Sequence, residues 1–278
     1  MELDALTPGD HVRMYEQVVS SIDEVCSQLA DDEWDILTDC PAWTVKDNLS
    51  HLASYEAIAA GMVEPVTTDI THLTHVKESD VFSTANEREV EARRAIPGRE
   101  VLSEFRDATA ARLKHFGALD DEGWEADVSR FPWGETPTKP AMAIRLLDFF
   151  YHEQDIRRAS DKPGHMDGQV AAVVFDSLAT RALPRVIAKK AQLPEGTIVT
   201  FDVDAPGRAV AVAVRDGRGV VEEPTADPAA RFALDQEAFF MLMGGRRTYL
   251  ELSAIGRVRA QGDRALIDDI VDALVVVP

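Results

Sequence analysis

Three side chains of types that bind divalent metal ions stand at spacings that helices can bring together. Asp148 and His152 are four residues apart in the apolar stretch RLLDFFYHEQDIRRA, and this separation puts both on one side of a helix. A carboxylate oxygen and an imidazole nitrogen are ordinary ligands of zinc. His51 lies in a second helix-like stretch and would complete a three-ligand site with at least one coordination position open.

The same spacing also occurs in hydrogen-bonded pairs that hold no metal. The position of Asp148 among leucine and phenylalanine side chains favours a metal, because a buried carboxylate needs a partner. Asp155 lies one turn further along the same face and could accept the other imidazole N–H of His152, as outer partners of metal ligands do. Arg145, one turn before Asp148, lies on the same side of the expected helix.

Other candidate groups are weaker. His72 and His75 form the pair HLTH in an irregular polar segment without a carboxylate pattern, and we expect both to face solvent. Cys40 precedes Pro41 in a loop and could be a nucleophile or a fourth ligand. No second cysteine or histidine pattern supports either role, so a buried structural thiol is favoured.

The metal-binding residues require an arrangement of helices, and capping signals indicate where these begin. Thr7 with Asp10, and Thr44 with Asp47, have the spacing of capping boxes. They predict a first helix to about residue 30 and a second through VKDNLSHLASYEAIAAGM, which carries His51. Further helices are expected at about 85–95, 99–116, 141–160 and 167–190, the last kinked at Pro184. The segment FPWGETPTKPAM, with three prolines and a glycine, is expected to be a loop.

The sequence pattern changes near Gly196. Alternating apolar residues with turn signals in TIVTFDVDAPGRAVAVAVRDGRGVV predict a β-meander. ARFALD and GRVRAQGD predict further strands, QEAFFMLMGG and a short segment after it predict helices, and ALIDDIVDALVVV predicts a closing amphipathic helix. We therefore expect two domains, a helical one over residues 1–190 and an α+β one over residues 191–278.

Composition limits the classes of partner. The 278 residues are 45% hydrophobic and 28% charged, with a formal net charge of −20 and two cysteines. So acidic a chain repels phosphate backbones, which argues against nucleic acid, and the charge is best explained by solubility. No apolar run is long enough to cross a membrane, and the acidic N-terminus is not a secretory signal. The sequence thus predicts a cytoplasmic protein, a monomer or weak homodimer.

Two of these stretches resemble the signatures of one family. CPAWTVKDNLSHL resembles the pattern C-P-x-W-T-x-x-D-x-x-x-H-L of the mycothiol-dependent maleylpyruvate isomerase family, within the DinB-like metal-binding superfamily. RLLDFFYHEQDIRRA resembles its second signature, an acidic residue, then His four later, then Asp three after that. The C-terminal region resembles the sterol-carrier-protein-like domain often appended there. The resemblance implies a mainly α, four-helix up-and-down bundle followed by an α+β domain.

The resemblance also implies a ligand set and a chemistry. His51, Asp148 and His152 would bind Zn²⁺, with mycothiol as the thiol cofactor. The family usually has Glu where this chain has Asp148, so the helix must approach the ion more closely or a water must bridge. The cation favours thiolate over thiol. Addition of that thiolate to an activated double bond, rotation and elimination would isomerise a cis-enoyl acid, whereas displacement of a leaving group would make the site an S-transferase.

Arginine side chains could anchor the carboxylates of an acidic substrate or cofactor. Arg145 and Asp155 are the candidates for catalytic roles, and Arg93, Arg94 and Arg157 for cofactor binding, although an arginine of this kind is more often an ordinary surface ion-pair residue. The leading hypothesis is a zinc-dependent thiol transferase or cis–trans isomerase that uses mycothiol on a small electrophilic or unsaturated acid. The alternatives are a metal-dependent hydrolase, or a non-catalytic protein that keeps the metal for structure and binds an apolar ligand or partner.

Overall fold

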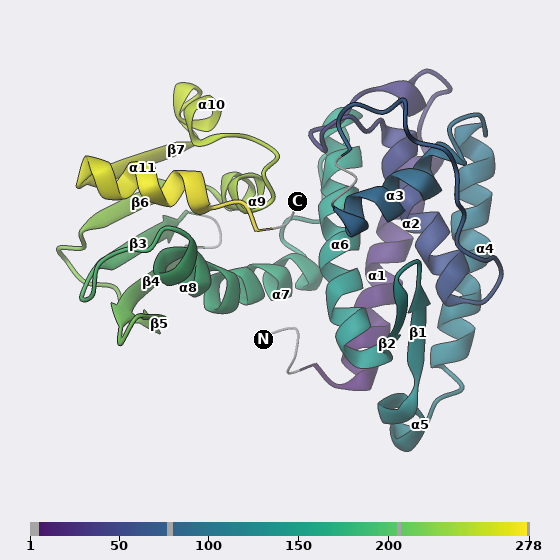
Figure 1. The fold of residues 1–278 in the computed structure, drawn as a ribbon, viewed down its shortest axis with the longest axis horizontal. Helices are drawn as coiled ribbons and strands as arrows, with labels where there is room; N and C mark the ends of the chain where they lie inside the picture. The colour runs from purple at the N-terminus through teal and green to yellow at the C-terminus, as the bar shows by residue number, and fades with distance from the viewer. Residues whose placement is uncertain (1–5, 77–79, 205–206, 277–278) are drawn as a thin grey trace. The chain divides into compact units, whose positions relative to one another are not determined.

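The computed structural model describes residues 6–76, 80–204 and 207–276. The chain divides into two compact units, Asp4–His165 and Met166–Pro278, called here the helical unit and the C-terminal unit (Figure 1). Across the described part of the chain, no helix combines the length and the apolar composition that a membrane crossing requires.

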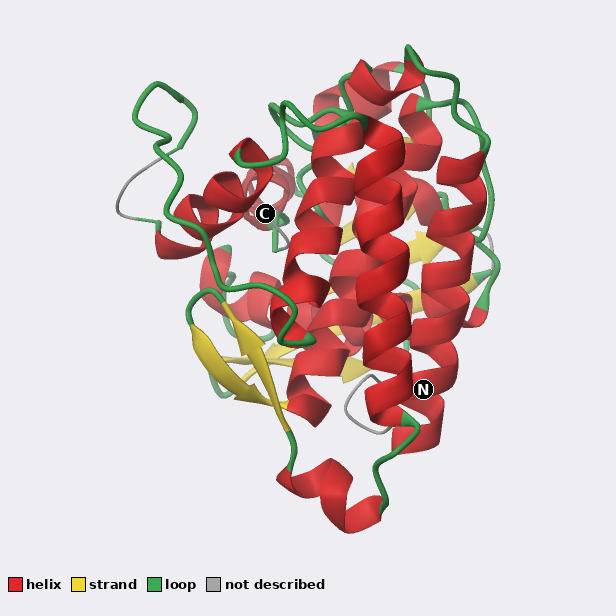
Figure 2. Ribbon diagram, turned by 90° about the vertical axis from the view of Figure 1, so that its right-hand side faces the viewer, coloured by secondary structure: helices red, strands yellow, loops and turns green. Residues whose placement is uncertain are grey.

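Four long helices form the helical unit: α1 (Pro8–Ser27), α2 (Val45–Ala59), α4 (Gly98–Phe116) and α6 (Thr138–Ala159). Helices α1 and α2 each pack against both α4 and α6, which closes the four into a bundle (Figure 2). The shorter elements are a 3₁₀ turn at Glu33–Asp35, α3 (Val81–Glu91) and α5 (Asp121–Ala126). The predicted four-helix bundle is confirmed.

Neighbouring helices α2 and α4 run in the same direction. Just before α4 begins, Arg94 Nη1 lies 3.7 Å from Asp47 Oδ2 near the start of α2. Towards the end of α4, Arg112 donates a hydrogen bond to the carbonyl oxygen of Ala59, where α2 ends. The residues between the two helices, which include α3, carry the chain back along the bundle. The alternation of a strict up-and-down bundle is therefore interrupted between α2 and α4.

Both predicted capping boxes are present. The Thr7 side chain accepts the backbone N–H of Asp10, and the Asp10 carboxylate accepts the N–H of Thr7. Thr44 and Asp47 make the same reciprocal bonds at the start of α2. These bonds satisfy backbone N–H groups that a helix start leaves without partners. The cap of α2 therefore fixes the point from which the helix places His51.

The segment predicted as a loop around FPWGETPTKPAM is instead a β-hairpin leading into α6. Strand β1 (Val128–Phe131) pairs with β2 (Gly134–Pro137) in antiparallel register, with Phe131 opposite Gly134. Pro132 and Trp133 form the two-residue turn, and Pro140 lies in the first turn of α6. The expectation was wrong because prolines are compatible with a turn, a strand end and a helix start.

A five-stranded sheet forms the centre of the C-terminal unit, in the order β5-β4-β3-β6-β7. Its strands are β3 (Ile198–Val203), β4 (Arg208–Arg215), β5 (Arg218–Glu222), β6 (Ala230–Leu234) and β7 (Val258–Gly262). Strands β3 to β5 form the predicted meander, and β3 pairs with β6 in parallel. Helices α9 (Gln236–Met243), α10 (Tyr249–Ala254) and α11 (Arg264–Ala273) follow the predicted order. The α+β class is confirmed.

A helical run connects the end of the helical unit to this sheet. It consists of α7 (Gln169–Ser177), α8 (Leu183–Arg185) and two π-helical stretches, Leu178–Ala182 and Val186–Lys190. The later part of the run packs on β4 and β5. A Cβ placed on Gly219 in β5 would come 2.1 Å from the carbonyl oxygen of Pro184, so only glycine permits this approach.

These contacts group the helical run with the C-terminal unit, so the chain divides after His165. The sequence had led us to expect the division near residue 190, with this run in the first domain. An apolar stripe identifies the face that a helix buries, but not the domain against which that face packs.

Candidate metal centre

The three predicted ligand side chains meet between α2 and α6. His51 Nε2 lies 3.2 Å from Asp148 Oδ2, and His152 Nε2 lies 3.3 Å from Asp148 Oδ1. One ligand atom from each of the three residues lies within 4.8 Å of the other two. The imidazole side chains are 3% and 7% exposed, whereas that of Asp148 is 25% exposed. Asp148 is therefore the most accessible of the three side chains, and the cluster can be approached from its side.

These separations suit a tetrahedrally coordinated divalent ion. Ligand bonds of about 2.0–2.2 Å at tetrahedral angles place neighbouring ligand atoms roughly 3.3 Å apart, close to the two nitrogen–oxygen distances in the cluster. The side chain of Asp148, although shorter than glutamate, reaches both imidazoles. Two nitrogens and one carboxylate oxygen are also a donor set that zinc accepts. The residues therefore fit the ion, and three ligands leave a coordination position open.

Asn48 fixes the orientation of His152. Its Oδ1 accepts a hydrogen bond from His152 Nδ1 at 2.6 Å, and its Nδ2 donates to the backbone oxygen of Thr44. Because an amide oxygen can only accept, Nδ1 carries a proton, which leaves Nε2, on the side of Asp148, as the nitrogen that could bind a metal ion. Asp155, the expected acceptor, lies farther away, with its Oδ2 3.6 Å from the same nitrogen. The sequence signal available for Asn48 was its position three residues before His51 on the same helix.

Trp43 packs against both imidazole rings, and sequence analysis did not single it out. Its ring centroid lies 5.2 Å from that of His51 and 5.5 Å from that of His152. Its Nε1 donates to a carboxylate oxygen of Glu87 in α3. The position of Trp43 immediately before the α2 cap was the available signal, because a residue there stays close to the first turns of the helix.

Arg145 links the cluster to a buried carboxylate. Its Nη1 donates to Asp148 Oδ2, and its Nε donates to Glu56 Oε1 at 2.9 Å. Glu56 also accepts the hydroxyl of Tyr15 at 2.6 Å. The Nη2 atom of Arg145 is buried and has no hydrogen-bond partner. Arg145 therefore holds one oxygen of Asp148 and retains one unused donor beside the cluster.

The pKa values of the two histidines are shifted in opposite directions. Burial lowers the pKa of His51 to about 4, despite the nearby Asp148 carboxylate. Burial also opposes a charge on His152, but the carboxylates of Asp148 and Asp155 outweigh it and raise the pKa of His152. Burial disfavours an ionised Asp148, yet His51, Arg145 and His152 together hold the pKa of Asp148 well below its ordinary value. The carboxylate is thus ready to bind a cation.

Cys40 also lies near His152. Its sulfur, a His152 nitrogen and an Asp155 oxygen form a second group within 4.8 Å. No partner pattern for Cys40 is visible in the sequence, because it is the loop before α2 that brings this thiol to α6. The thiol is buried, as expected, and packs with Trp43. Since His152 Nδ1 donates to Asn48, the group that contains Asp148 is the better donor set.

The three arginines considered for cofactor binding all have acidic partners. They pair as follows: Arg93 with Glu89 and Glu104, Arg94 with Glu87 and Glu91, and Arg157 with Glu153. The side chains of Arg93 and Arg157 are buried, whereas that of Arg94 is 33% exposed. The rival histidines His72 and His75 are both exposed, as predicted.

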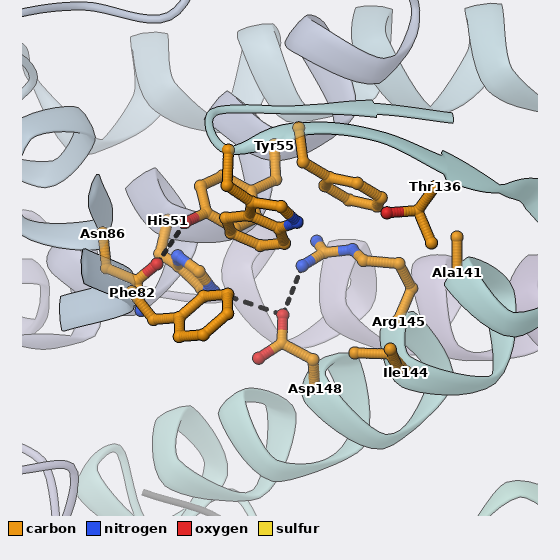
Figure 3. A pocket seen from close by; sticks show the side chains of 11 residues that line it. His51, Tyr55, Phe82, Asn86, Thr136, Ala141, Ile144, Arg145 and Asp148 are labelled. Carbon is orange, nitrogen blue, oxygen red and sulfur yellow. Dashed lines mark hydrogen bonds and ion pairs between the residues drawn. The ribbon is translucent and has the colours of Figure 1, made fainter. Parts of the chain in front are cut away.

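A cavity of about 300 Å³ opens directly onto the cluster. His51, Asp148 and Arg145 line it, and Figure 3 shows the Asp148 carboxylate between the other two side chains. The remaining lining is largely aromatic and aliphatic, from α2, α3, the hairpin and the start of α6. A small molecule in this cavity would therefore lie against the exposed side of the cluster.

Comparison with known proteins points to one family. The model described as the mycothiol maleylpyruvate isomerase N-terminal domain matches residues 15–157, a span that contains all three cluster residues. No curated protein matches the chain by sequence.

Solved structures show a related fold. A crystal structure of the mycothiol-dependent maleylpyruvate isomerase is 12% identical and covers 94% of this chain and 95% of its own, with a TM-score of 0.57. A histidine-to-alanine mutant of that enzyme is 11% identical and covers 89% and 92%, with a TM-score of 0.58. Sterol Carrier Protein 2 Like 2 from Aedes aegypti is 17% identical and covers 35% and 94%, with a TM-score of 0.29.

Proposed function

The chain belongs to the mycothiol maleylpyruvate isomerase N-terminal domain family, and on this premise we propose that it is a zinc-dependent enzyme that uses mycothiol either to isomerise a small unsaturated acid or to transfer the thiol to a small electrophilic acid. The observation that carries the proposal is the convergence of His51, Asp148 and His152 beside a cavity. Three ligands and an open side are typical of a catalytic zinc site rather than a closed structural one.

The protein's own residues prepare the site for the ion. His51 Nε2, His152 Nε2 and an Asp148 oxygen would hold it, with Asn48 fixing the proton on the other nitrogen of His152. Two neutral imidazoles and one carboxylate leave a divalent ion with net positive charge, which favours thiolate over thiol in a bound cofactor. The aromatic packing of Trp43 on both rings restricts their movement.

Arg145 is the residue proposed to orient the electrophile. It lines the cavity, and its Nη2 has no partner, so it can donate a hydrogen bond to a substrate oxygen. Asp155 is proposed as a positioning residue, because its carboxylate faces His152 Nδ1 from 3.6 Å. Arg93 and Arg157 are held by buried acidic partners, which leaves Arg94 as the more accessible of the three proposed cofactor-binding arginines.

Cobalt substitution tests the proposal. The purified protein should contain about one zinc per chain, and the Co²⁺ form should gain a sulfur-to-cobalt charge-transfer band when mycothiol is added. S-methylated mycothiol, which cannot form a thiolate, is the matched ligand control and should give no such band. An unchanged spectrum with mycothiol would contradict an open, thiol-binding position and favour a structural role for the metal.

A further inference from the structure

Four aromatic rings form one connected wall of the cavity. Phe131 and Trp133 stack with centroids 5.1 Å apart and an interplanar angle of 8°. Phe82 and Tyr55 meet Trp133 edge-on at 5.0 and 5.6 Å. All four line the cavity, and Ile144 adds an aliphatic side chain. Flat, apolar groups gain most from such a surface, through burial and through offset or edge-on ring contacts.

Among the described residues that line the cavity, one side chain is cationic, and its guanidinium group already pairs with two carboxylates. That residue is Arg145, the one arginine or lysine of the described lining. Its Nε is taken by Glu56 and its Nη1 by Asp148, so that one donor group, Nη2, remains. Asn86, whose amide oxygen accepts the Tyr55 hydroxyl, and Thr136 also line the cavity, but both are uncharged. The cavity can therefore satisfy one oxygen-bearing group of a ligand by charge-assisted hydrogen bonding.

A second carboxylate would have no comparable partner. It would lie against the aromatic wall, and moving an ionised carboxylate out of water without a partner is strongly unfavourable. The open coordination position could not compensate, because in the proposed reaction the thiol occupies it. A volume of about 300 Å³ is at the lower end of the roughly 300–1,000 Å³ that small-molecule sites occupy. A single ring with a short side chain is of suitable size.

We propose that the electrophile of this site is a flat, apolar molecule, aromatic or similarly unsaturated, with one carboxylate or carbonyl group, and that dicarboxylates such as maleylpyruvate are discriminated against. The inference rests on the proposed function for the site's chemistry, and it concerns only which electrophile the site accepts. In this arrangement the ring lies on Trp133 and Phe131, and the single oxygen group meets Arg145 Nη2 beside Asp148.

Binding of two unreactive analogues tests this assignment. The full-length, zinc-loaded protein is first saturated with mycothiol, so that the thiol occupies the open position. It is then titrated calorimetrically with 3-phenylpropanoate, an aromatic monoanion, and with glutarate, a dicarboxylate that lacks the ring. We expect 3-phenylpropanoate to bind at least tenfold more tightly. Equal or tighter binding of glutarate, or no binding of 3-phenylpropanoate, would overturn the assignment.

A substitution at Trp133 tests the contribution of the aromatic wall to binding without disturbing the fold. The Trp133 side chain is in a hairpin turn and the residue is 41% exposed, so a replacement there should leave folding and zinc content intact. Trp133→Ala should weaken 3-phenylpropanoate binding at least fivefold, and Trp133→Phe should restore most of it. Unchanged binding in Trp133→Ala would overturn the assignment. Neither analogue reacts, so these titrations report only on which electrophile the cavity accepts. Failure of the proposed function would appear separately, as a cobalt spectrum that mycothiol does not alter.

Discussion

The two units differ in what they bury. The C-terminal unit, over its described residues, buries three polar side chains, Ser177, Thr200 and Arg246, whereas α2 alone buries Asp47, Asn48, Ser50, His51, Ser54 and Glu56. Phe201 and Phe232 stack at 4.8 Å in the sheet of the C-terminal unit, so burial of apolar surface dominates there. In the helical unit, each buried charge needs a partner to offset the loss of hydration.

The difference indicates what each interior is selected for. An apolar core of the same volume would generally be at least as stable as a buried ion-pair network. The helical unit nevertheless keeps Arg145 between Glu56 and Asp148, at the margin of the cavity. Its interior is therefore organised around the candidate metal centre, and its stability depends on pairing of buried charges, whereas the C-terminal unit depends on packing.

The largest effect is expected from a substitution at His51, a candidate metal ligand in the helical unit. We expect His51→Ala to lower zinc affinity by about a thousandfold or more, on the order of 4 kcal/mol, and to abolish turnover, because two protein ligands remain. Zinc content after dialysis measures the loss. His72→Ala, which alters an exposed imidazole, is the control and should keep its zinc. Full zinc content in His51→Ala would remove this residue from the ligand set.

Glu56 tests the dependence on pairing. Its loss in Glu56→Ala would leave Arg145 without its partner at 2.9 Å and Arg112 without a carboxylate at 3.6 Å. We expect the free energy of unfolding of the helical unit to fall by about 3–5 kcal/mol, as measured by urea denaturation. Glu64→Ala removes a carboxylate that is 75% exposed and should change stability by less than about 0.5 kcal/mol. Similar losses in the two variants would contradict the comparison.

The two histidines should titrate apart in the metal-free protein. His51 should have its midpoint near pH 4, while His152 should retain its proton above the ordinary histidine range. Because the pKa of folded His51 lies below its unfolded value, this group destabilises the fold as the pH falls from about 6.5 to 4. His152 has the opposite sign, since its contribution is present below pH 6.5 and is lost as the pH rises through its raised pKa. Imidazole nitrogen NMR measures both midpoints, and a common midpoint near 6.5 would disprove the separation.

Asn48 provides a sharper test of positioning. Asn48→Ala removes the acceptor at 2.6 Å from His152 Nδ1 and should weaken zinc binding by roughly 10–100-fold, as loss of an outer partner usually does. Competition with a chromophoric chelator measures the affinity. Asn86→Ala is a matched control, because Asn86 lines the cavity and its amide oxygen accepts the Tyr55 hydroxyl rather than an imidazole N–H. Unaltered zinc affinity in Asn48→Ala would show that His152 is oriented by other contacts.

The smallest expected effects come from a pair of matched helix caps. Thr44 and Thr248 each form a capping box, at α2 in the helical unit and at α10 in the C-terminal unit. Alanine at either position should cost about 1 kcal/mol of stability, as seen in thermal unfolding. Only Thr44→Ala should also reduce zinc affinity, because α2 carries His51 and Asn48. An equal effect of both variants on zinc would mean that the cap does not position the ligands.

Much of the fold could be predicted from local patterns. The caps at Thr7 and Thr44 and the alternation in β3 to β5 depend on residues close together in the chain, and each was identified before the structure. The hairpin was missed because Pro132 and Pro137 suggested a loop. Pairing between β1 and β2 does not follow from the composition of either strand alone.

The candidate site was predictable only in part, for the same physical reason. Asp148 and His152 share a helix face, and a resemblance added His51. The sequence does not show, however, which segments far apart in the chain come into contact. The approach of Trp43 and Cys40 to His152 depends on how the loop before α2 packs on α6. The pairing of Arg145 with Glu56, 89 residues away in the chain, depends on the same packing.

The hairpin β1–β2 has a consequence for how such enzymes diversify. The candidate ligands lie on α2 and α6, whose relative placement the bundle fixes, while Phe131 and Trp133 belong to a short hairpin between α5 and α6. Mutations or insertions at this hairpin can change the shape of the cavity at little cost to the metal site. Under the proposed function, part of the substrate preference would be encoded at residues 131–134, apart from the candidate ligands, so that natural variation or a directed library there can explore new electrophiles while the ligand residues stay unchanged.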